Sequence, residues 1–446
     1  MKAWALRSTR IVQGDALVSG HLLVGGDGRI EGVVAQAPTD RALVDVGTHV
    51  VSPGLVDCHV HINEPGRTDW EGYETATRAA AAGGVTSLVD MPLNCIPVTT
   101  TADAFAQKLA ACRDKCFVDV GFWGGVIPGN ADELPALARA GVLGCKAFMV
   151  HSGIDEFPNA TREDLQRAMP LLRDAGIPLL AHAELDLGAE VHEHDPRAYR
   201  GYLESRPAAW EDAAIAQLIE LARGTGCHVH VVHLSAASSI PALRAAKAEG
   251  LRISVETCPH YLCLEAEAIP DGATQYKCAP PIRDHNNREA LWRGLQEGVI
   301  DFVITDHSPC TPQLKQFERG HFHDAWGGIA SLQLGLPTLW THARERGASI
   351  PQLARWISEN PARFAGLSKR KGKIAQGFDA DLVVWDPDAT FRVREHDLFF
   401  KHRVSPYLGM DLRGVVRRTF LRGREVFDGA AHSAGPIGQM LLGRDD

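Results

Sequence analysis

The sequence predicts an α/β protein in which a (β/α)8 TIM barrel carries a small, discontinuous β-sandwich made from both ends of the chain. Three observations support this fold class: a helix, glycine and short strand recur through the centre, both ends are rich in β segments, and polar side chains close several central strands. The chain of 446 residues is too long for one ordinary core and suits a large barrel plus a smaller domain. The predicted boundaries are residues 1–52 for the N-terminal part of the sandwich, 53–365 for the barrel, and 366–446 for the C-terminal part and a tail.

The two ends of the chain share a texture of short strands and turns. A segment of about 50 residues is too small to bury a core alone, so we expect the two ends to form one domain. A hairpin-type turn at residues 25–28 supports the β assignment of the first segment. The β-rich stretches are 10–12, 22–24 and 30–34 near the start, and 372–375, 381–385, 415–416 and 424–426 near the end.

The centre of the chain repeats one unit. An alanine-rich helix is predicted over residues 75–82, Gly83-Gly84 ends it, and a strand follows at 85–89. Such alternation indicates βα units around a parallel sheet, and its extent fits a barrel better than a doubly wound sheet. A doubly wound sheet would also call for a phosphate-binding glycine loop, and no GxGxxG or P-loop pattern is present. The unit recurs as helix 162–175 with strand 177–181, helix 240–249 with strand 251–255, and helix 288–297 with strand 299–304.

Composition excludes several classes of protein. Hydrophobic residues make up 45% of the chain and charged residues 23%, the balance of a globular protein. The net charge of −9 lacks the basic footprint of a nucleic-acid binder. No apolar run reaches the roughly 18 residues that span a bilayer, and the N-terminus lacks the apolar core of a signal peptide. The ten cysteines form no CxxC pair. We therefore expect a cytoplasmic protein without a nucleic-acid or membrane partner.

The pair His59 and His61 follows the turn signal Ser52-Pro53-Gly54. Side chains two residues apart on a strand point the same way and lie about 7 Å apart. Two imidazoles on one face at the end of an apolar strand suit a divalent transition metal. A His-x-His pair alone is also common on surfaces and in satisfied cores. The metal interpretation therefore requires further ligands at other strand ends.

Other central strands supply such groups at their C-terminal ends, where the chemistry of a (β/α)8 barrel lies. The stretch 227–235 offers three histidines. His228 and His230 share one face, whereas His233 lies on the other face and nearest the end, so we expect His233 to point inward. His228 and His230 would then face the helix layer or lie deeper. The remaining candidates are Lys146 within 142–150, which could instead snorkel or sit at an edge, His182 after 178–181, and Asp306 after 302–305.

Together these residues resemble the binuclear cyclic amidohydrolases, a group of (β/α)8 barrels with a flanking β-sandwich that includes dihydroorotases, hydantoinases and allantoinases. The resemblance covers nearly the whole chain and is strongest to the allantoinase branch. It implies hydrolysis of the cyclic amide of allantoin to allantoate by a hydroxide that bridges two metal ions. The alternatives are a hydantoinase or dihydropyrimidinase, a dihydroorotase-like enzyme, or a scaffold without metals, although such scaffolds lack several of the ligands present here. The stretches that carry the branch resemblance are 61–74, 91–94, 257–261, 277–284, 305–310 and 325–329.

The resemblance also assigns roles at the metal site. Two divalent ions are implied, Zn²⁺ first, although Co²⁺, Mn²⁺ or Fe²⁺ can occupy such a site. A protonated lysine cannot be a ligand, but burial lowers a lysine's pKa and exposes a neutral amine that can add CO₂. The implied ligands are His59 and His61 for the more buried ion, His182 and His233 for the more exposed ion, Lys146 as a bridging N6-carboxylysine, and Asp306, which completes the buried site and shuttles the proton.

At two positions this sequence differs from other branches of the family, and both positions bear on the substrate. Dihydroorotases have an arginine where Asn63 stands, so the sequence favours a neutral ring over a carboxylate. Only Arg67 or Arg283 could replace that arginine. Hydantoinases have a tyrosine where His151 stands; His151 could polarise the reacting carbonyl or be a solvated loop histidine.

Four further expectations concern the substrate and the assembly. Asn94 could donate a hydrogen bond to the ureido arm or only form a turn. The backbone around Ala279 would line the ring, by the family pattern. The segment Gly66 to Trp70 could be a lid or an ordinary loop. The resemblance also implies a homotetramer.

Overall fold

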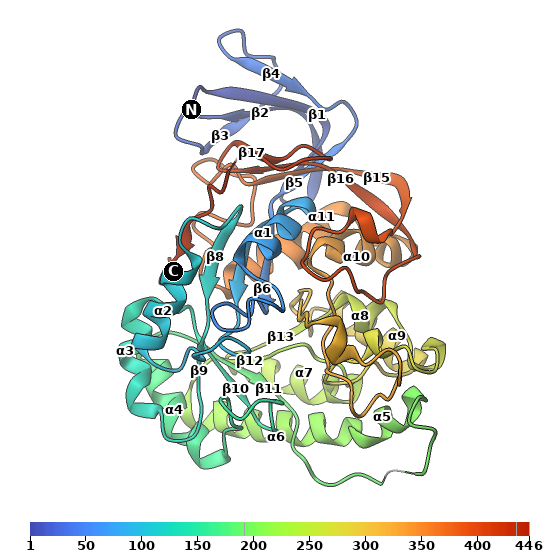
Figure 1. Cartoon of the computed structure of the whole chain (residues 1–446). Coiled ribbons are helices and arrows are strands. Elements are labelled where there is room, and N and C mark those ends of the chain that lie inside the picture. Colours follow the sequence, from blue (N-terminus) through green and yellow to red (C-terminus); the bar gives the residue numbers. More distant parts are fainter. Residues whose placement is uncertain (191, 434, 446) are drawn as a thin grey trace.

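Strands from both ends of the chain form one eight-stranded sheet in the computed structural model, which describes residues 1–190, 192–433 and 435–445. Its order is β17-β16-β15-β5-β1-β2-β3, with β4 paired to β1, and it lies at one end of the molecule (Figure 1). The strands are β1 Trp4–Gln13, β2 Ala16–Val24, β3 Ile30–Val34, β4 Ala42–Asp45, β5 Val50–Pro53, β15 Leu382–Arg392, β16 Asp411–Leu421 and β17 Arg424–Phe427.

Strand β1 brings the two parts of this sheet together. Its register shifts between Ser8 and Ile11, so that its first half pairs with β4 and its second half with β5. The stretch 372–375, predicted as β, forms no strand, although Ile374 packs into the same core. The apolar core takes side chains from both ends of the chain, as predicted for a discontinuous domain: Leu6, Ile11, Leu22, Val24, Ile30, Val51, Ile374, Ala380, Leu382, Val384 and Phe420.

The central strands form the predicted parallel barrel. Residues 119–125 join its two sheets, because β8 pairs with β7 and β9 with β10. The ring closes where Val60 bridges to His307 and the His61 amide donates to the His307 carbonyl at 2.8 Å. The strands are buried almost throughout, as expected when helices cover a parallel sheet. They are β6 Leu55–Val60, β7 Val85–Asp90, β8 Asp119–Phe122, β9 Gly124–Gly125, β10 Cys145–Phe148, β11 Leu179–His182, β12 Val229–Val231, β13 Ile253–Thr257 and β14 Phe302–Val303.

Helices follow the barrel strands, and the predicted ones begin and end within a few residues of their observed bounds. Thr161 and Asp164 form a reciprocal capping box that starts α4. The helices are α1 Tyr73–Ala82, α2 Ala102–Cys112, α3 Leu134–Ala140, α4 Arg162–Asp174, α5 Tyr199–Ser205, α6 Ala208–Thr225, α7 Ile240–Ala248, α8 Pro259–Cys263, α9 His285–Gln296, α10 Gly335–Glu345, α11 Ile350–Ala354 and α12 Asn360–Phe364. Within the described residues, none of them is long and apolar enough to cross a bilayer.

The terminal sheet and the barrel are tied at several points. Strand β5 ends at Pro53 and β6 begins at Leu55, so the chain passes directly from one to the other. At Gly54, a Cβ atom would overlap the side chain of Thr86 in β7, which explains why glycine stands at this crossing. Near the C-terminus, β18 Met440–Leu441 pairs with β8 of the barrel.

A buried lysine provides a further tie. Lys371 Nζ lies 2.7 Å from Asp119 of β8, 2.6 Å from Asp381 and 3.0 Å from Asp379, and its side chain is 1% exposed. The barrel and the segment that leads into β15 therefore share one buried charge cluster.

Replacement of this lysine should destabilise the whole fold. Lys371→Met removes the ammonium that pairs with three buried carboxylates, of which only Asp119 keeps another cation, Arg422, and we expect the free energy of unfolding to fall by about 3–5 kcal/mol. Urea unfolding followed by circular dichroism measures the change. The control is Lys373→Met, which removes a half-exposed pair with Glu359 and should cost no more than about 1 kcal/mol. Equal stability of the two variants would contradict a structural role for Lys371.

Candidate metal centre

One cavity lies at the C-terminal ends of the barrel strands. Its volume is about 480 Å³. The six predicted ligands come from the end of β6 and the residue after it, from β10 and β11, and from the turns that follow β12 and β14. The cavity wall includes all six predicted ligands: His59, His61, Lys146, His182, His233 and Asp306.

The four imidazoles and the carboxylate lie close together. The ring centroids of His59 lie 5.5 Å from His61 and 5.3 Å from His233, and those of His182 and His233 lie 4.7 Å apart. Asp306 Oδ1 lies 3.3 Å from His59 Nε2 and 3.5 Å from His61 Nε2. His59, His233 and Asp306 each offer a ligand atom within 4.8 Å of the others. This spacing suits a shared cation.

Three buried nitrogen atoms of this cluster have no hydrogen-bond partner among the described residues: His59 Nε2, Lys146 Nζ and His233 Nδ1. Buried polar atoms without a partner are uncommon and costly, so their convergence indicates a ligand. Burial lowers the pKa of Lys146 to about 8 and holds the pKa values of His59 and His233 well below the ordinary histidine range. Neutral imidazoles and a partly neutral amine fit divalent cations and a carboxylated lysine.

The backbone at the strand ends is strained where these side chains turn inward. His233 has φ 38° and Asp306 has φ 45°, in the left-handed region that non-glycine residues rarely adopt. Asn63 and Asn94, at φ 67° and 66°, are in the same region. Each such residue costs about 1–3 kcal/mol and persists where the surrounding structure holds it. The strain is concentrated at the ends of the strands around the cavity.

Two glutamates behind the ligands were not anticipated from the sequence. Glu256 accepts hydrogen bonds from His59 Nδ1 at 2.5 Å, His230 Nε2 at 3.0 Å and the His233 amide at 3.3 Å. Glu184 accepts one from His182 Nε2 at 2.6 Å. A carboxylate on one ring nitrogen fixes the tautomer and leaves the other nitrogen for a metal. A glutamate in the apolar strand β13 was the available signal.

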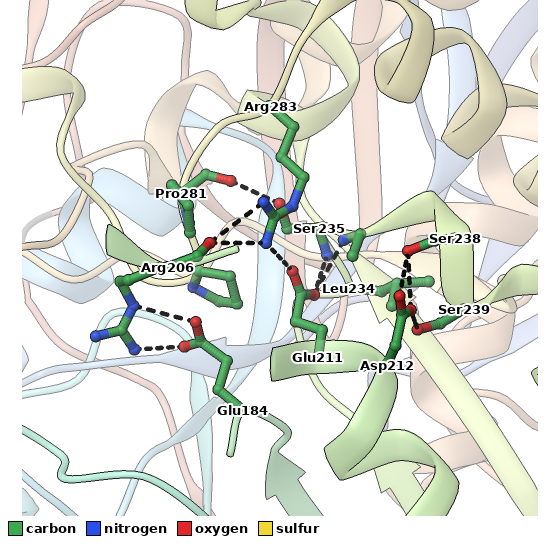
Figure 2. Close-up of polar contacts among 12 residues, drawn as sticks. Glu184, Arg206, Glu211, Asp212, Leu234, Ser235, Ser238, Ser239, Pro281 and Arg283 are labelled. Carbon is green, nitrogen blue, oxygen red and sulfur yellow. Dashed lines mark hydrogen bonds and ion pairs between the residues drawn. The ribbon is translucent and has the colours of Figure 1, made fainter. Parts of the chain in front are cut away.

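Figure 2 shows how two arginines hold this region. Burial alone would raise the pKa of Glu184, but Arg206 and His182 outweigh it and lower that pKa to about 2. Arg283 pairs with Glu211 at 2.7 Å and donates to the Arg206 carbonyl at 3.3 Å. The second oxygen of Glu211 accepts from the amides of residues 235 and 236, each at 3.0 Å. Glu211 therefore holds the turn after His233 in place.

The arginines considered as carboxylate binders are engaged elsewhere. Arg67 donates to the Asn94 carbonyl at 3.1 Å and to Glu156 at 3.2 Å, and Arg283 is paired with Glu211. Neither is among the described residues that line the cavity.

The other predicted substrate contacts lie on the cavity wall. Asn94 is buried, with Nδ2 3.5 Å from His61 Nδ1. The His151 side chain is 61% exposed and accepts from the Gly153 amide at 3.1 Å. Ala279 lines the cavity, and Trp70 of the predicted lid packs edge-on against Trp326 with centroids 5.0 Å apart. His230 lies deeper, fully buried under Glu256.

Comparison with known proteins decides the family. Residues 50–426 match the model of the amidohydrolase family. The chain belongs to the amidohydrolase family. Curated relatives of this amidohydrolase include the allantoinase of Streptomyces avermitilis, 48% identical and covering 98% of both chains, and that of Arabidopsis thaliana, 44% identical over 98% of this chain and 90% of its own. The L-hydantoinase of Arthrobacter aurescens has a similar solved structure, with a TM-score of 0.92 at 28% identity, covering 99% of this chain and 100% of its own. The predicted family and fold class are confirmed.

Glu256, which lies behind two of the predicted ligands, offers a direct test of the candidate metal centre. Glu256→Gln keeps the shape but replaces one of the two carboxylate oxygens that bond His59 and His230 by an amide NH₂ group, so we expect metal affinity to fall by about 10–100-fold. Competition with a fluorescent chelator measures this. The control Glu163→Gln changes an exposed glutamate of α4 and should leave the affinity unchanged. Wild-type affinity in the Glu256 variant would contradict the assigned role.

Proposed function

We propose that this amidohydrolase is an allantoinase, which hydrolyses the ring amide of allantoin to give allantoate. We propose this substrate because the chain is similar over nearly its full length to enzymes named allantoinase. The allantoinases of a bacterium, a plant and a yeast are 48%, 44% and 43% identical, over 98%, 98% and 96% of this chain. The cavity agrees with a neutral ring, because Arg67 and Arg283 are held by other groups and Arg206, which lines the cavity, is paired with Glu184.

We propose two divalent ions at the centre, Zn²⁺ first among the alternatives Co²⁺, Mn²⁺ and Fe²⁺. The ligand set supports this: His59, His61 and Asp306 would hold the more buried ion, and His182 and His233 the more exposed one. Lys146 would bridge both ions after its neutral amine attacks CO₂, forms an N–C bond and loses a proton. When bound, the ions polarise the amide carbonyl and lower the pKa of water to about 7.

The chain's own residues would position the substrate and move the proton. Asp306 lies at the base of the cavity beside His59 and His61, within reach of a nucleophile held there. Its carboxylate would take the proton from the attacking water and deliver it to the ring nitrogen as the C–N bond breaks. Asn94, His151 and the backbone at Ala279 line the same cavity and would hold the ring and its ureido arm.

The alternatives differ in the charge and substituents of their substrates. A hydantoinase or dihydropyrimidinase would take hydantoins with apolar substituents, and a dihydroorotase needs a cation for a carboxylate. The homotetramer, the cytoplasmic location, the lid at Gly66 to Trp70 and the domain boundaries at 52/53 and 365/366 stay predictions.

A parallel assay tests the proposed substrate. Metal-loaded protein is incubated with allantoin, hydantoin, dihydrouracil and dihydroorotate, and kcat/KM is measured for each. We expect allantoin to exceed every other substrate by at least about tenfold, because the ureido arm adds hydrogen bonds that the analogues lack. A preference for hydantoin, dihydrouracil or dihydroorotate would contradict the assignment and identify the alternative.

The proton role of Asp306 predicts a catalytic loss without a loss of fold. Asp306→Asn should lower kcat by about 10²–10⁴-fold, the usual contribution of a positioned acid–base group. The control Asp155→Asn changes a fully exposed carboxylate near the rim and should retain normal turnover. Near-normal kcat in Asp306→Asn would remove Asp306 from the reaction.

A further inference from the structure

One wall of the cavity is an irregular segment. Residues 323–328 all line the cavity, yet they belong to no helix or strand. Three of its amides donate to backbone carbonyls: that of Ala325 to His321 at 3.1 Å, and those of Trp326 and Gly328 to Leu314 and Lys277, both at 2.8 Å. The carbonyl groups of an irregular segment need donors from elsewhere.

Two buried lysines supply those donors. Lys277 Nζ donates to the carbonyls of residues 323 and 325 at 2.9 and 2.6 Å. Lys315 Nζ donates to the carbonyls of residues 326 and 328 at 3.0 and 2.5 Å. Four carbonyls of a six-residue segment are thus bound by two ammonium groups.

These lysines form no ion pair with a described residue. Lys277 is 9% exposed and Lys315 4%, and among the described residues no carboxylate lies within ion-pair distance of either. Burial lowers the pKa of both, that of Lys277 to about 8. Burying a charge without a partner is costly unless hydrogen bonds compensate, and here the compensating bonds all go to one wall of the cavity.

The wall carries a tryptophan that contacts two other loops. Trp326 packs edge-on against Trp70 with centroids 5.0 Å apart. A Cβ atom added at Gly153 would lie 3.3 Å from Cη2 of Trp326, so the indole also covers that turn. The metal-ligand histidines lie deep, at most 6% exposed, whereas Trp326 is half-buried. Trp326 is thus a large side chain on the part of the cavity wall that lies nearer the solvent than the histidines.

We propose that Lys277 and Lys315 are positioning residues that hold the wall 323–328 so that Trp326 limits the size of the ring substituent the site admits. The inference rests on the proposed function for its substrate class, a five-membered cyclic amide with a small polar arm. A loosely held indole could move aside for a bulky group, whereas a fixed one excludes it.

The first test is a ratio of two substrates. We compare kcat/KM for allantoin with that for 5-benzylhydantoin, which has a benzyl group in place of the ureido arm. The fraction of folded enzyme cancels in this ratio. We expect Lys277→Met, Lys315→Met and Trp326→Ala each to lower the ratio at least about tenfold, the discrimination typical of a close-fitting pocket.

Two variants make the ratio test decisive. Lys369→Met changes an exposed lysine and should keep the wild-type ratio. Trp326→Ala leaves both lysines in place, so it reports on the barrier even if a lysine variant folds poorly. An unchanged ratio in Trp326→Ala, or in both lysine variants, would overturn the proposal.

The second test needs no substrate. Hydrogen exchange of metal-loaded protein, read by mass spectrometry, follows the peptide that spans 323–328. We expect about tenfold faster exchange in Lys315→Met, the effect of losing charge-assisted hydrogen bonds, and no change in Lys369→Met. Wild-type exchange in the Lys315 variant would overturn the proposal that this lysine holds the wall 323–328. If wild-type enzyme hydrolyses hydantoins but not allantoin, the proposed function fails. Hydrogen exchange, and the ratio of kcat/KM for hydantoin to that for 5-benzylhydantoin, then still test whether the two lysines hold the wall.

Discussion

A lysine enclosed in the barrel, with no partner for its amine, is the constraint on which the centre depends. Lys146 is fully buried, and its Nζ has no hydrogen bond among the described residues. Phe148 lies beside it, with Nζ 5.1 Å from the ring centroid. An isolated ammonium in such surroundings is costly, and burial accordingly lowers its pKa to about 8. Conversion of the amine to a carbamate between cations would remove that cost.

Residues behind the cavity wall hold the side chains around Lys146 in place. Glu256 and Glu184 orient imidazoles, and Arg206 keeps Glu184 charged. The left-handed backbone at His233 and Asp306 is strain that this support holds in place. At the wall 323–328 the charges are reversed. There, buried lysines orient backbone carbonyls, whereas at the base buried glutamates orient imidazoles. The cavity is thus rigid at its base and at one side of its mouth.

Much of the fold could be predicted from the sequence because barrel units have a local signature. Gly83-Gly84 after an alanine-rich helix marks a βα unit without any long-range information. The sequence also indicated which side chains would meet at the cavity, since His59, His61 and Asp306 end apolar strands and all three line it. The choice of His233 over its neighbours rested on strand alternation. His233 does line the cavity and His230 lies deeper, bonded to Glu256. However, β12 ends at Val231, and a left-handed turn, not the strand, places His233.

Other features depend on contacts between distant segments and had no local signal. Glu256 and His59 are 197 positions apart in the chain. Arg283 pairs with Glu211 of α6, and this contact forms only when α6 packs against the segment that carries Arg283. The stretch 372–375 was predicted as β, yet Gly, Lys and Ala are depleted in strands, and in the fold it forms none and only Ile374 reaches the core. Lys277 and Lys315 look like ordinary surface lysines in the sequence, because their partners are backbone carbonyls.

The carbamate bridge is tested most directly by X-ray diffraction from crystals grown with zinc and bicarbonate, with anomalous data at the zinc edge. The account predicts two anomalous peaks flanking extra density bonded to Nζ of Lys146. An unmodified lysine, with one peak or none under metal-replete conditions, would contradict it.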